Sequence, residues 1–467
     1  SNVTGDGNDI AHIGTFCEKY NLNFILNASQ TAGTIEIDME QNHISAICFT
    51  GHKGLFGPQG TGGIALADGV CVKPLLSGGS GVHSFERKHP MELPAALEAG
   101  TLNGHGIAGL HAALDWIKKT GIAAIHEKEM ALAEQFQRGI ETIPGIHLYG
   151  GEKRVAAIVS CNLADLDSAY VSDCLAEDYG IATRAGVHCA PLMHTHFGTE
   201  KQGMVRFSFS CFNTTEEVEK AVRAMQDIAA ENRGKVTAYV GAGGKTSSIR
   251  KRAETLRAEG KRVLILTTTK MMVPQEQEIF AAYEQTGQES VISATASVWQ
   301  ERRAAEKQLK ERVQSVLDTY GCCVAGSLIP GTEKFGMLPE KLMEDLLYLA
   351  DEILIEADGS AHMPVKAPAE HEPVLFPYMD EVVIVMGAHA IGKPLREVCH
   401  RVDYAKELLK CDADKIVTAA DLKTLAEQGY AIPIQKQYPW MKISKVTGKD
   451  IKLCLTAEKK DKERDKQ

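Results

Sequence analysis

The sequence contains no run of eighteen or more uncharged apolar residues, so no membrane-spanning helix is expected. Basic residues are not in excess either: the formal net charge is −10, and this balance argues against nucleic-acid binding. The twelve cysteines form no C-x-x-C pair, which favours free thiols in a reducing cytoplasm over disulfides. A hydrophobic content of 44% over 467 residues is typical of a globular protein with two to three domains.

Alternating helix and strand patterns divide the chain into two α/β halves. Residues 1–231 end in the amphipathic stretch TTEEVEKAVRAMQDIAAE, in which Thr214 and Glu217 have the spacing of a capping box. A polar linker, residues 232–235, follows. A second alternation, residues 236–456, opens with strand VTAYV, loop GAGGK and helix TSSIRKRAETLRAEG. The mixed-charge residues 457–467 are expected to form a disordered tail.

Each half has a glycine-rich loop with a lysine. In TGHKGLFGPQGTG, residues 50–62, Lys53 precedes most of the glycines. This is the wrong order for a phosphate loop, whose backbone N–H groups wrap the phosphates before the helix begins. A lysine that emerges from an apolar strand can instead form a Schiff base. From the residues alone, a solvated loop lysine is the alternative.

Cys189 follows His188 in the loop RAGVHCAP. A thiolate nucleophile needs a cationic neighbour or an exposed electropositive loop, and His188 is expected to supply the positive charge. Two other interpretations stay open: an inert buried thiol, and a metal site formed with His194 and His196.

Several stretches of the first half resemble the class V aminotransferase family, and within it the cysteine desulfurases: SNVTG, NASQTAG, FTGHKGLFGPQGTG, LEAGTLN, RAGVHCAP and VRFSFSCFNTTEEVE. The resemblance runs in the family's order through residues 1–231. It implies the fold of pyridoxal-phosphate-dependent transferases and a homodimer. It also implies a reaction in which a cysteine thiolate takes sulfur or selenium from L-cysteine or L-selenocysteine and passes it to an acceptor protein.

The resemblance also implies roles for individual residues. Lys53 corresponds to the lysine that holds pyridoxal 5'-phosphate as a Schiff base, and Cys189 to the nucleophile, with His188 beside it. Arg206 corresponds to the arginine that binds the substrate carboxylate, a task that suits the planar guanidinium. The corresponding cofactor-binding positions are Asn2, Asn27, Gln30, Thr50, His52 and Thr101.

Two departures from the family pattern reduce the expected activity of this chain. Asn27 stands where the family has an aspartate that keeps the cofactor's ring nitrogen protonated, and an amide cannot stabilise that charge. The family's glycine–threonine phosphate turn and its ring-stacking histidine lie upstream of SNVTG. The first half is therefore expected to be an amino-terminally truncated domain that binds pyridoxal phosphate poorly.

The second loop, VGAGGKTSS, has the order of a phosphate loop: a strand, glycines, a lysine, then a helix. Backbone N–H groups at Gly241, Gly243 and Gly244 are expected to face a phosphate, with Lys245 neutralising its charge and Thr246 ligating Mg²⁺. The first glycine of the usual motif is absent, and a tight structural turn is the alternative.

Candidate ligands for the Mg²⁺ ion come from a later apolar strand, which ends in Glu356 and Asp358. The segment TTTK, residues 267–270, ends a neighbouring strand. Because ligands bind at the carboxyl ends of parallel strands, these segments are expected to converge on the glycine loop. A solvated acidic loop is the alternative for the two carboxylates.

The stretches VGAGGKTS, TTTK, IEADGSAHMPVKAPAEHEPV and GAHAIGKPL resemble an accessory family of selenium-dependent molybdenum hydroxylases. This resemblance implies a P-loop domain that uses ATP or GTP with Mg²⁺ during maturation of such an enzyme. The chain is therefore expected to mobilise sulfur or selenium for a molybdenum hydroxylase. The alternative is a non-catalytic desulfurase-like scaffold attached to a P-loop nucleotide hydrolase or kinase.

Overall fold

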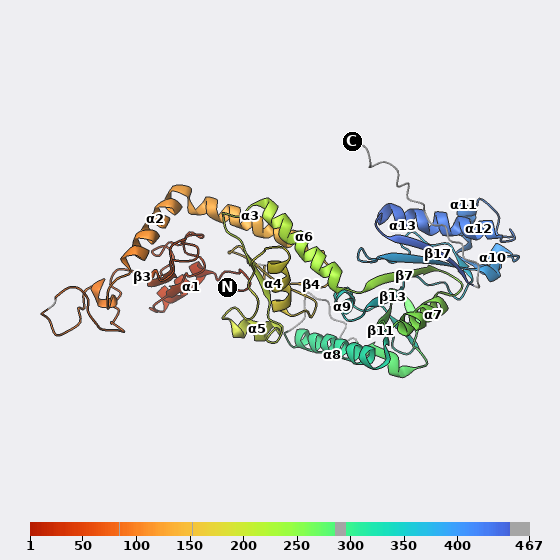
Figure 1. Cartoon of the computed structure of the whole chain (residues 1–467), viewed down its shortest axis with the longest axis horizontal. Helices are drawn as coiled ribbons and strands as arrows, with labels where there is room; N and C mark the ends of the chain where they lie inside the picture. The colour runs from red at the N-terminus through yellow and green to blue at the C-terminus, as the bar shows by residue number, and fades with distance from the viewer. Residues whose placement is uncertain (84, 152, 285–295, 449–467) are drawn as a thin grey trace. The chain divides into compact units, whose positions relative to one another are not determined.

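The computed structural model describes residues 1–83, 85–151, 153–284 and 296–448, and the expected tail at 457–467 lies outside them (Figure 1). The chain divides into two compact units, Ser1–Ile228 and Ala229–Gln467. Among the described helices, none is long and apolar enough to cross a membrane.

Unit 1 opens with α1 (Ile10–Lys19), which Asp9 caps by accepting the N–H of His12. Its first sheet has the order β1 (Ile25–Asn27), β2 (Ala46–Thr50), β3 (Gly62–Leu66), with β1 and β2 parallel and β3 antiparallel to β2. Because β1 and β2 are parallel, their carboxyl ends lie at one edge of the sheet. The loops that follow Asn27 and Thr50 therefore start from the same edge.

The second sheet of unit 1 is antiparallel, in the order β4 (Ile146–Tyr149), β5 (Ile158–Leu163), β6 (Val205–Ser208). Every residue of β5 is buried, so the sheet is covered on both faces. The remaining elements of the unit are η1 (Ala95–Leu97), α2 (Gly104–Thr120), α3 (Ile122–Ile140), α4 (Ser168–Glu177), α5 (Pro191–Phe197) and α6 (Thr215–Asn232).

The expected capping box is present at the start of α6. Thr214 Oγ1 accepts the N–H of Glu217 at 3.3 Å, and the Glu217 carboxylate accepts the N–H of Thr214 at 3.1 Å. The helix runs to Asn232, and the next strand begins at Lys235. Two residues, 233 and 234, therefore separate the two elements, instead of the four-residue linker expected at 232–235.

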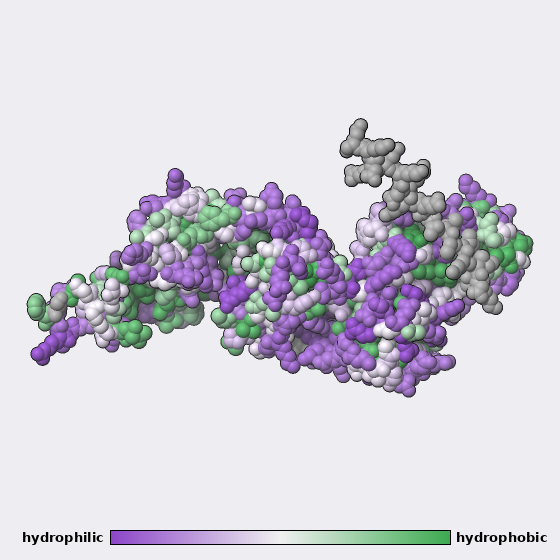
Figure 2. All heavy atoms as spheres, in the orientation of Figure 1, coloured by the Kyte–Doolittle hydropathy of each residue, from purple (hydrophilic) through white to green (hydrophobic). Residues whose placement is uncertain are grey.

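Large apolar side chains are exposed on α1 and β1 of unit 1. Phe16, Tyr20, Leu22 and Ile25 have exposed fractions of 52%, 55%, 53% and 64%. Figure 2 shows hydrophobic residues over the region of α1 and β3. Tyr20 and Leu22 lie in the connection between these two elements, so the exposed side chains follow one stretch of the chain.

The sheet of unit 2 has the order β17-β15-β7-β13-β8-β11-β12-β9, with β10 paired to β11. Its parallel strands are β7 (Lys235–Gly241), β8 (Val263–Thr267), β10 (Phe280–Tyr283), β11 (Cys322–Leu328), β13 (Glu352–Glu356), β15 (Glu381–Gly387) and β17 (Lys442–Gly448). Two short strands, β9 (Lys270–Met272) and β12 (Lys334–Gly336), are antiparallel to their neighbours. Strand β7 is central, and β13 lies between it and β8.

Helices cover both faces of this sheet (Figure 1). On one face, α7 (Lys245–Ala258) buries Ile249, Ala253 and Leu256 against the strands. The helices on the opposite face are α8 (Ala296–Tyr320), α9 (Glu340–Leu346), α10 (Leu395–Val398), α11 (Val402–Leu409), α12 (Ala419–Thr424), η4 (Leu425–Ala431) and α13 (Ile432–Gln437). The other elements are η2 (Gln277–Ile279), η3 (Ala388–Ala390) and the pair β14 (Val365–Lys366) and β16 (Cys399–His400).

Candidate functional site

The first candidate site lies at the carboxyl edge of the β1–β2 pair. Lys53 is exposed in the loop that follows β2, and Thr50, the last residue of that strand, contacts His52 with 2.6 Å between Oγ1 and Nδ1. Asn27 ends β1, and its side-chain oxygen accepts the N–H of Ser29 at 3.1 Å. The sheet thus brings an amine, a hydroxyl, an imidazole and an amide to one edge.

A close backbone contact holds the two loops of this edge together. Gly33 has a φ of +88°, and a Cβ placed on it would lie 2.3 Å from the carbonyl oxygen of Gly54. The half-buried Gln30 lies in the first loop and Lys53 in the second. Thr101, which the resemblance assigns to a contact across a dimer interface, is exposed in the segment before α2. The structure therefore groups Lys53 with the positions on β1 and β2.

The second candidate site surrounds Cys189, which is exposed and precedes α5. His188 and Cys189 have φ angles of +54° and +56°, a backbone conformation that residues other than glycine rarely adopt. The Arg184 guanidinium donates to Cys189 Sγ at 3.6 Å. Strained backbone and a guanidinium beside an exposed thiol are typical of a functional cysteine rather than a structural one.

Asn2 and Arg206 form a chain of hydrogen bonds that supports the Cys189 loop. The Asn2 amide donates to the carbonyl oxygen of His188 at 2.6 Å, and Arg206 donates to the carbonyl oxygen of Asn2 at 3.0 Å. Burial lowers the pKa of Arg206, the Arg184 guanidinium lowers it further, and Cys189 opposes the shift. Both arginines thus act electrostatically on the same small region as Cys189.

His188 does not supply the positive charge expected beside Cys189. Its side chain is 2% exposed, and burial lowers its pKa, with Arg206, His194 and Arg184 acting in the same direction. Nε2 lies 2.9 Å from the carbonyl oxygen of Arg184, while the buried Nδ1 has no hydrogen-bond partner among the residues that the structure describes. His188 is therefore neutral near pH 7, and the cation at Cys189 is Arg184.

The third candidate site is the glycine loop of unit 2, between β7 and α7. Gly241, Gly243 and Gly244 have φ angles of +91°, +81° and +128°. A Cβ on Gly241 would lie 2.2 Å from the carbonyl oxygen of Val385, and one on Gly243 would lie 2.5 Å from that of Pro364. This path is open only to glycine. It delivers Lys245 as the first residue of α7.

Lys245 is held by Asp358 in a buried ion pair. Nζ lies 3.0 Å from Oδ1 of Asp358 and donates to the carbonyl oxygen of Gly241 at 2.6 Å. The other carboxylate oxygen accepts the N–H of Gly241 and the hydroxyl of Tyr430, both at 2.9 Å. Lys366, which is fully buried, has its Nζ 3.6 Å from the same oxygen. The expected metal-ligand role of Asp358 does not fit this arrangement, because its oxygens already face two ammonium groups, an amide and a hydroxyl.

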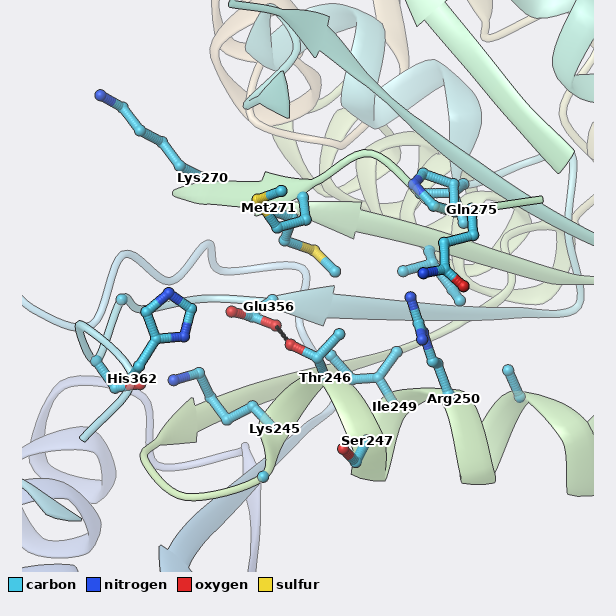
Figure 3. A pocket seen from close by; sticks show the side chains of 18 of the residues that line it. Lys245, Thr246, Ser247, Ile249, Arg250, Lys270, Met271, Gln275, Glu356 and His362 are labelled. Carbon is cyan, nitrogen blue, oxygen red and sulfur yellow. Dashed lines mark hydrogen bonds between the residues drawn. The ribbon is translucent and has the colours of Figure 1, made fainter. Parts of the chain in front are cut away.

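Glu356 and Thr246 meet as the sequence predicts. The Thr246 hydroxyl donates to the Glu356 carboxylate at 2.8 Å (Figure 3), and Thr267 Oγ1, at the end of β8, donates to the Glu356 carbonyl oxygen at 2.9 Å. Burial raises the pKa of Glu356, while Lys245 opposes the rise. The two side chains can hold a hard cation through oxygen atoms.

Lys245, Thr246 and Glu356 line a pocket of about 700 Å³. This volume is within the usual size range of small-molecule sites. In Figure 3, Lys245 and His362 project into one end, and Arg250 and Gln275 into the other. Lys270 points away from the Thr246–Glu356 pair. Across the described ranges, no group of three or more histidine, cysteine, aspartate or glutamate side chains is arranged to hold a metal ion.

Residues 1–221 match the family model described as aminotransferase class-V. The first unit is therefore similar to that family over nearly all of its length. Residues 237–403 match a second model, described as YqeC protein, and cover the glycine loop, Glu356 and Asp358. The match of the class-V unit contains both of its candidate sites.

The curated relatives of the class-V unit are cysteine desulfurases. A probable cysteine desulfurase of Methanothermobacter thermautotrophicus is 33% identical over 234 residues, which is 49% of this chain and 58% of that protein. A cysteine desulfurase of Shigella flexneri is 30% identical over 233 residues, 49% of this chain and 56% of its own. The chain thus spans a little over half the length of the relatives it matches.

A solved structure gives the same partial coverage. The apo cysteine desulfurase of Thermococcus onnurineus NA1 is 30% identical, with a TM-score of 0.46, covering 50% of this chain and 58% of that one.

Sequence reasoning missed three functional candidates: Arg184, Lys366 and Tyr430. Arg184 opens the quoted motif RAGVHCAP, five residues before Cys189, and its position on that short loop was the available signal. Tyr430 reaches Asp358 from a helix 72 residues along the chain, so no local pattern connects them. Lys366 lies in the block PVKAPAEHEP, but its burial depends on β14 pairing with β16.

Proposed function

We propose that the class-V unit, within the intact protein, removes sulfur or selenium from L-cysteine or L-selenocysteine in a reaction dependent on pyridoxal 5'-phosphate. The observation that carries the proposal is the exposed Cys189 on a strained loop with the Arg184 guanidinium 3.6 Å from its sulfur. The cysteine desulfurases among the relatives of this unit support it. We also propose that the protein forms a homodimer, because a second copy would bury the exposed apolar side chains near α1 and β1.

The donor set at the carboxyl edge of β1 and β2 fits the cofactor. Lys53 offers an exposed amine for a covalent bond, and Thr50 and His52 offer a hydroxyl and an imidazole to a phosphate. Gln30 lies in the loop whose Gly33 closely approaches the backbone of Gly54, the residue after Lys53. Asn27 orders its own turn through Ser29, and its amide carries no charge to pair with a protonated ring nitrogen. The bound cofactor would supply electron withdrawal from the substrate amino acid.

The Cys189 loop performs the sulfur transfer in this proposal. Cys189 Sγ, as the thiolate, attacks the substrate sulfur: a sulfur–sulfur bond forms, the substrate carbon–sulfur bond breaks, and alanine leaves after protonation at carbon. Arg184 stabilises negative charge on Sγ, and Arg206, anchored by Asn2, is close enough to receive the substrate carboxylate. The neutral, buried His188 positions the loop.

We further propose that unit 2 binds ATP or GTP with Mg²⁺. In this proposal the turn at Gly243 and Gly244 presents its backbone N–H groups to a phosphate, whereas the Gly241 N–H stays bound to Asp358, and Thr246 with Glu356 offers oxygen ligands to the metal. In the intact protein, the two activities would serve maturation of a molybdenum hydroxylase, with the terminal sulfur or selenium passed from Cys189 to an acceptor.

The test uses the full-length protein, since this chain covers 58% of the length of its relative from Methanothermobacter thermautotrophicus. The protein is incubated with pyridoxal phosphate and L-cysteine, and alanine release and the mass of the peptide that contains Cys189 are recorded. The proposal expects alanine and one extra sulfur on that peptide, with both lost in Cys189→Ser. Cofactor incorporation without alanine or persulfide would favour the non-catalytic scaffold.

A further inference from the structure

We propose that the groove along α7, beyond the Thr246–Glu356 pair, binds a second small molecule that has an apolar body and a carboxylate or phosphate group. This inference rests on the proposed nucleotide site, because it places the second molecule next to the terminal phosphate. The groove is defined here by Thr246, Ile249, Arg250, Met271 and Gln275.

One face of α7 forms the floor of the groove. Thr246, Ile249, Arg250, Ala253 and Arg257 all line the same pocket, and their spacing of three to four residues places them on one side of the helix. From Thr246 to Arg257 this face extends roughly 16 Å, at 1.5 Å per residue. The lining thus continues well past the loop that would hold the phosphates.

The expected position of a bound nucleotide places its terminal phosphate next to the groove, where a co-substrate would react with it. The phosphates of a nucleotide belong to the turn at Gly243 and Gly244, where the backbone bends toward α7. Thr246, on α7, and Glu356, at the end of β13, would hold the metal and line the same pocket as the groove. The terminal phosphate would therefore face the groove, and a molecule lying there would meet its reactive end.

The groove has the chemistry of an amphipathic anion site. In Figure 3, Met271 hangs over the space above Ile249, and Arg250 rises from α7 toward Gln275. Within the described residues Arg250 forms no ion pair, whereas Lys245 is already paired to Asp358. Glu254 and Glu276 also line the pocket, but Arg257, Lys270 and Lys334 offset their charges. The exposed Arg250 guanidinium can bind a carboxylate or phosphate with two parallel hydrogen bonds. Water alone, as in simple hydrolysis, needs no such groove.

The probe for the experiment is 8-anilinonaphthalene-1-sulfonate, a fluorescent molecule with an aromatic body and one anionic group. Its binding to the full chain is compared for wild type, Arg250→Glu and Lys251→Glu. Lys251 is the adjacent exposed cation on α7 and does not line the pocket, so it is the matched control. We expect Arg250→Glu to weaken one saturable binding component roughly tenfold or more, since the charge reversal opposes the sulfonate, and Lys251→Glu to leave it unchanged.

Competition distinguishes the occupants of the groove. With Mg²⁺ present, neither tripolyphosphate nor ATP should displace the probe if the groove takes a separate molecule. Displacement by ATP but not by tripolyphosphate would show that the groove holds the nucleoside, and would overturn the proposal. Equal probe binding in wild type and Arg250→Glu would also overturn it. If calorimetry detects no binding of ATP or tripolyphosphate while the Arg250→Glu effect persists, the nucleotide proposal fails and the groove remains.

Discussion

Lys245 and Asp358 form an ion pair with 3.0 Å between Nζ and Oδ1, and their side chains are 4% and 0% exposed. This pair, rather than a metal site, explains why a carboxylate lies at the base of the glycine loop. Breaking one partner of a buried pair leaves the other charge without compensation, which is far more costly than losing an exposed pair.

Asp358→Asn should therefore lower the free energy of unfolding of unit 2 by about 3–5 kcal/mol. Denaturant unfolding followed by circular dichroism measures the loss. Lys235→Met is the control, because its partner is Glu381 and its side chain is 44% exposed; it should cost less than about 1 kcal/mol. Equal effects of the two substitutions would contradict the assigned role of Asp358.

Arg184→Gln should slow alkylation of Cys189 by iodoacetamide roughly tenfold, because the substitution removes the cation beside the sulfur. The modified peptide is quantified by mass spectrometry over time. Arg223→Gln, on the exposed pair with Glu219, should leave the rate unchanged. An unaltered rate in Arg184→Gln would mean that the guanidinium does not act on the thiol.

His188 should make unit 1 sensitive to acid. Burial holds its pKa below the ordinary value of 6.5, so the folded state binds the proton less readily than the unfolded chain. The stability contributed by neutral His188 is therefore fully present above pH 6.5 and is lost as the pH falls through the lowered pKa. Thermal unfolding midpoints should decline over that window, and less steeply in His188→Gln. Identical slopes would assign the effect to other groups.

Gly33→Ala should displace the loop that carries Gln30 and weaken cofactor binding in the full-length protein. The new Cβ would meet the Gly54 carbonyl oxygen at 2.3 Å, in a backbone conformation of φ +88° that costs an alanine about 1–2 kcal/mol. Spectroscopic titration with pyridoxal phosphate measures the affinity. Gly69→Ala is matched in φ, at +80°, but a Cβ there meets nothing within 4 Å, and it should bind normally.

Asn27→Asp should raise alanine release by the full-length protein roughly tenfold, since a carboxylate supplies the charge that an amide lacks. The change is structurally mild: either side chain can accept the N–H of Ser29. Turnover under saturating cofactor is the measurement. No gain would indicate that Asn27 does not face the cofactor ring.

Local patterns were sufficient to place the elements but not the charges. The capping box at Thr214 and the order of strand, glycines and helix around Lys245 depend on neighbours in sequence, and both are present. The convergence of Thr246 with Glu356 followed from the rule that carboxyl ends of parallel strands share one edge.

The roles of His188 and Asp358 were not predictable in the same way. The sequence position of His188 beside Cys189 suggested a cation, but burial lowers the pKa of His188 and favours the neutral form. The sequence predicts that Asp358 is a metal ligand. The structure shows instead that Tyr430 and Lys366, from other elements, contact its carboxylate. Desolvation and long-range pairing are properties of the packed chain, and a sequence shows neither.

Because β7 lies inside the sheet of unit 2, ligand binding at its loop should be measurable by hydrogen exchange of the strand. The strand that carries the glycine loop is hydrogen-bonded on both sides, to β13 and β15, so its amide protons should exchange with solvent only when the whole sheet opens. A ligand held by the loop then binds the closed sheet alone. At a hundredfold excess over its dissociation constant it should slow exchange throughout β7 by the equivalent of about 2.7 kcal/mol. Strand-wide protection would thus serve as a ligand assay that needs no catalytic turnover.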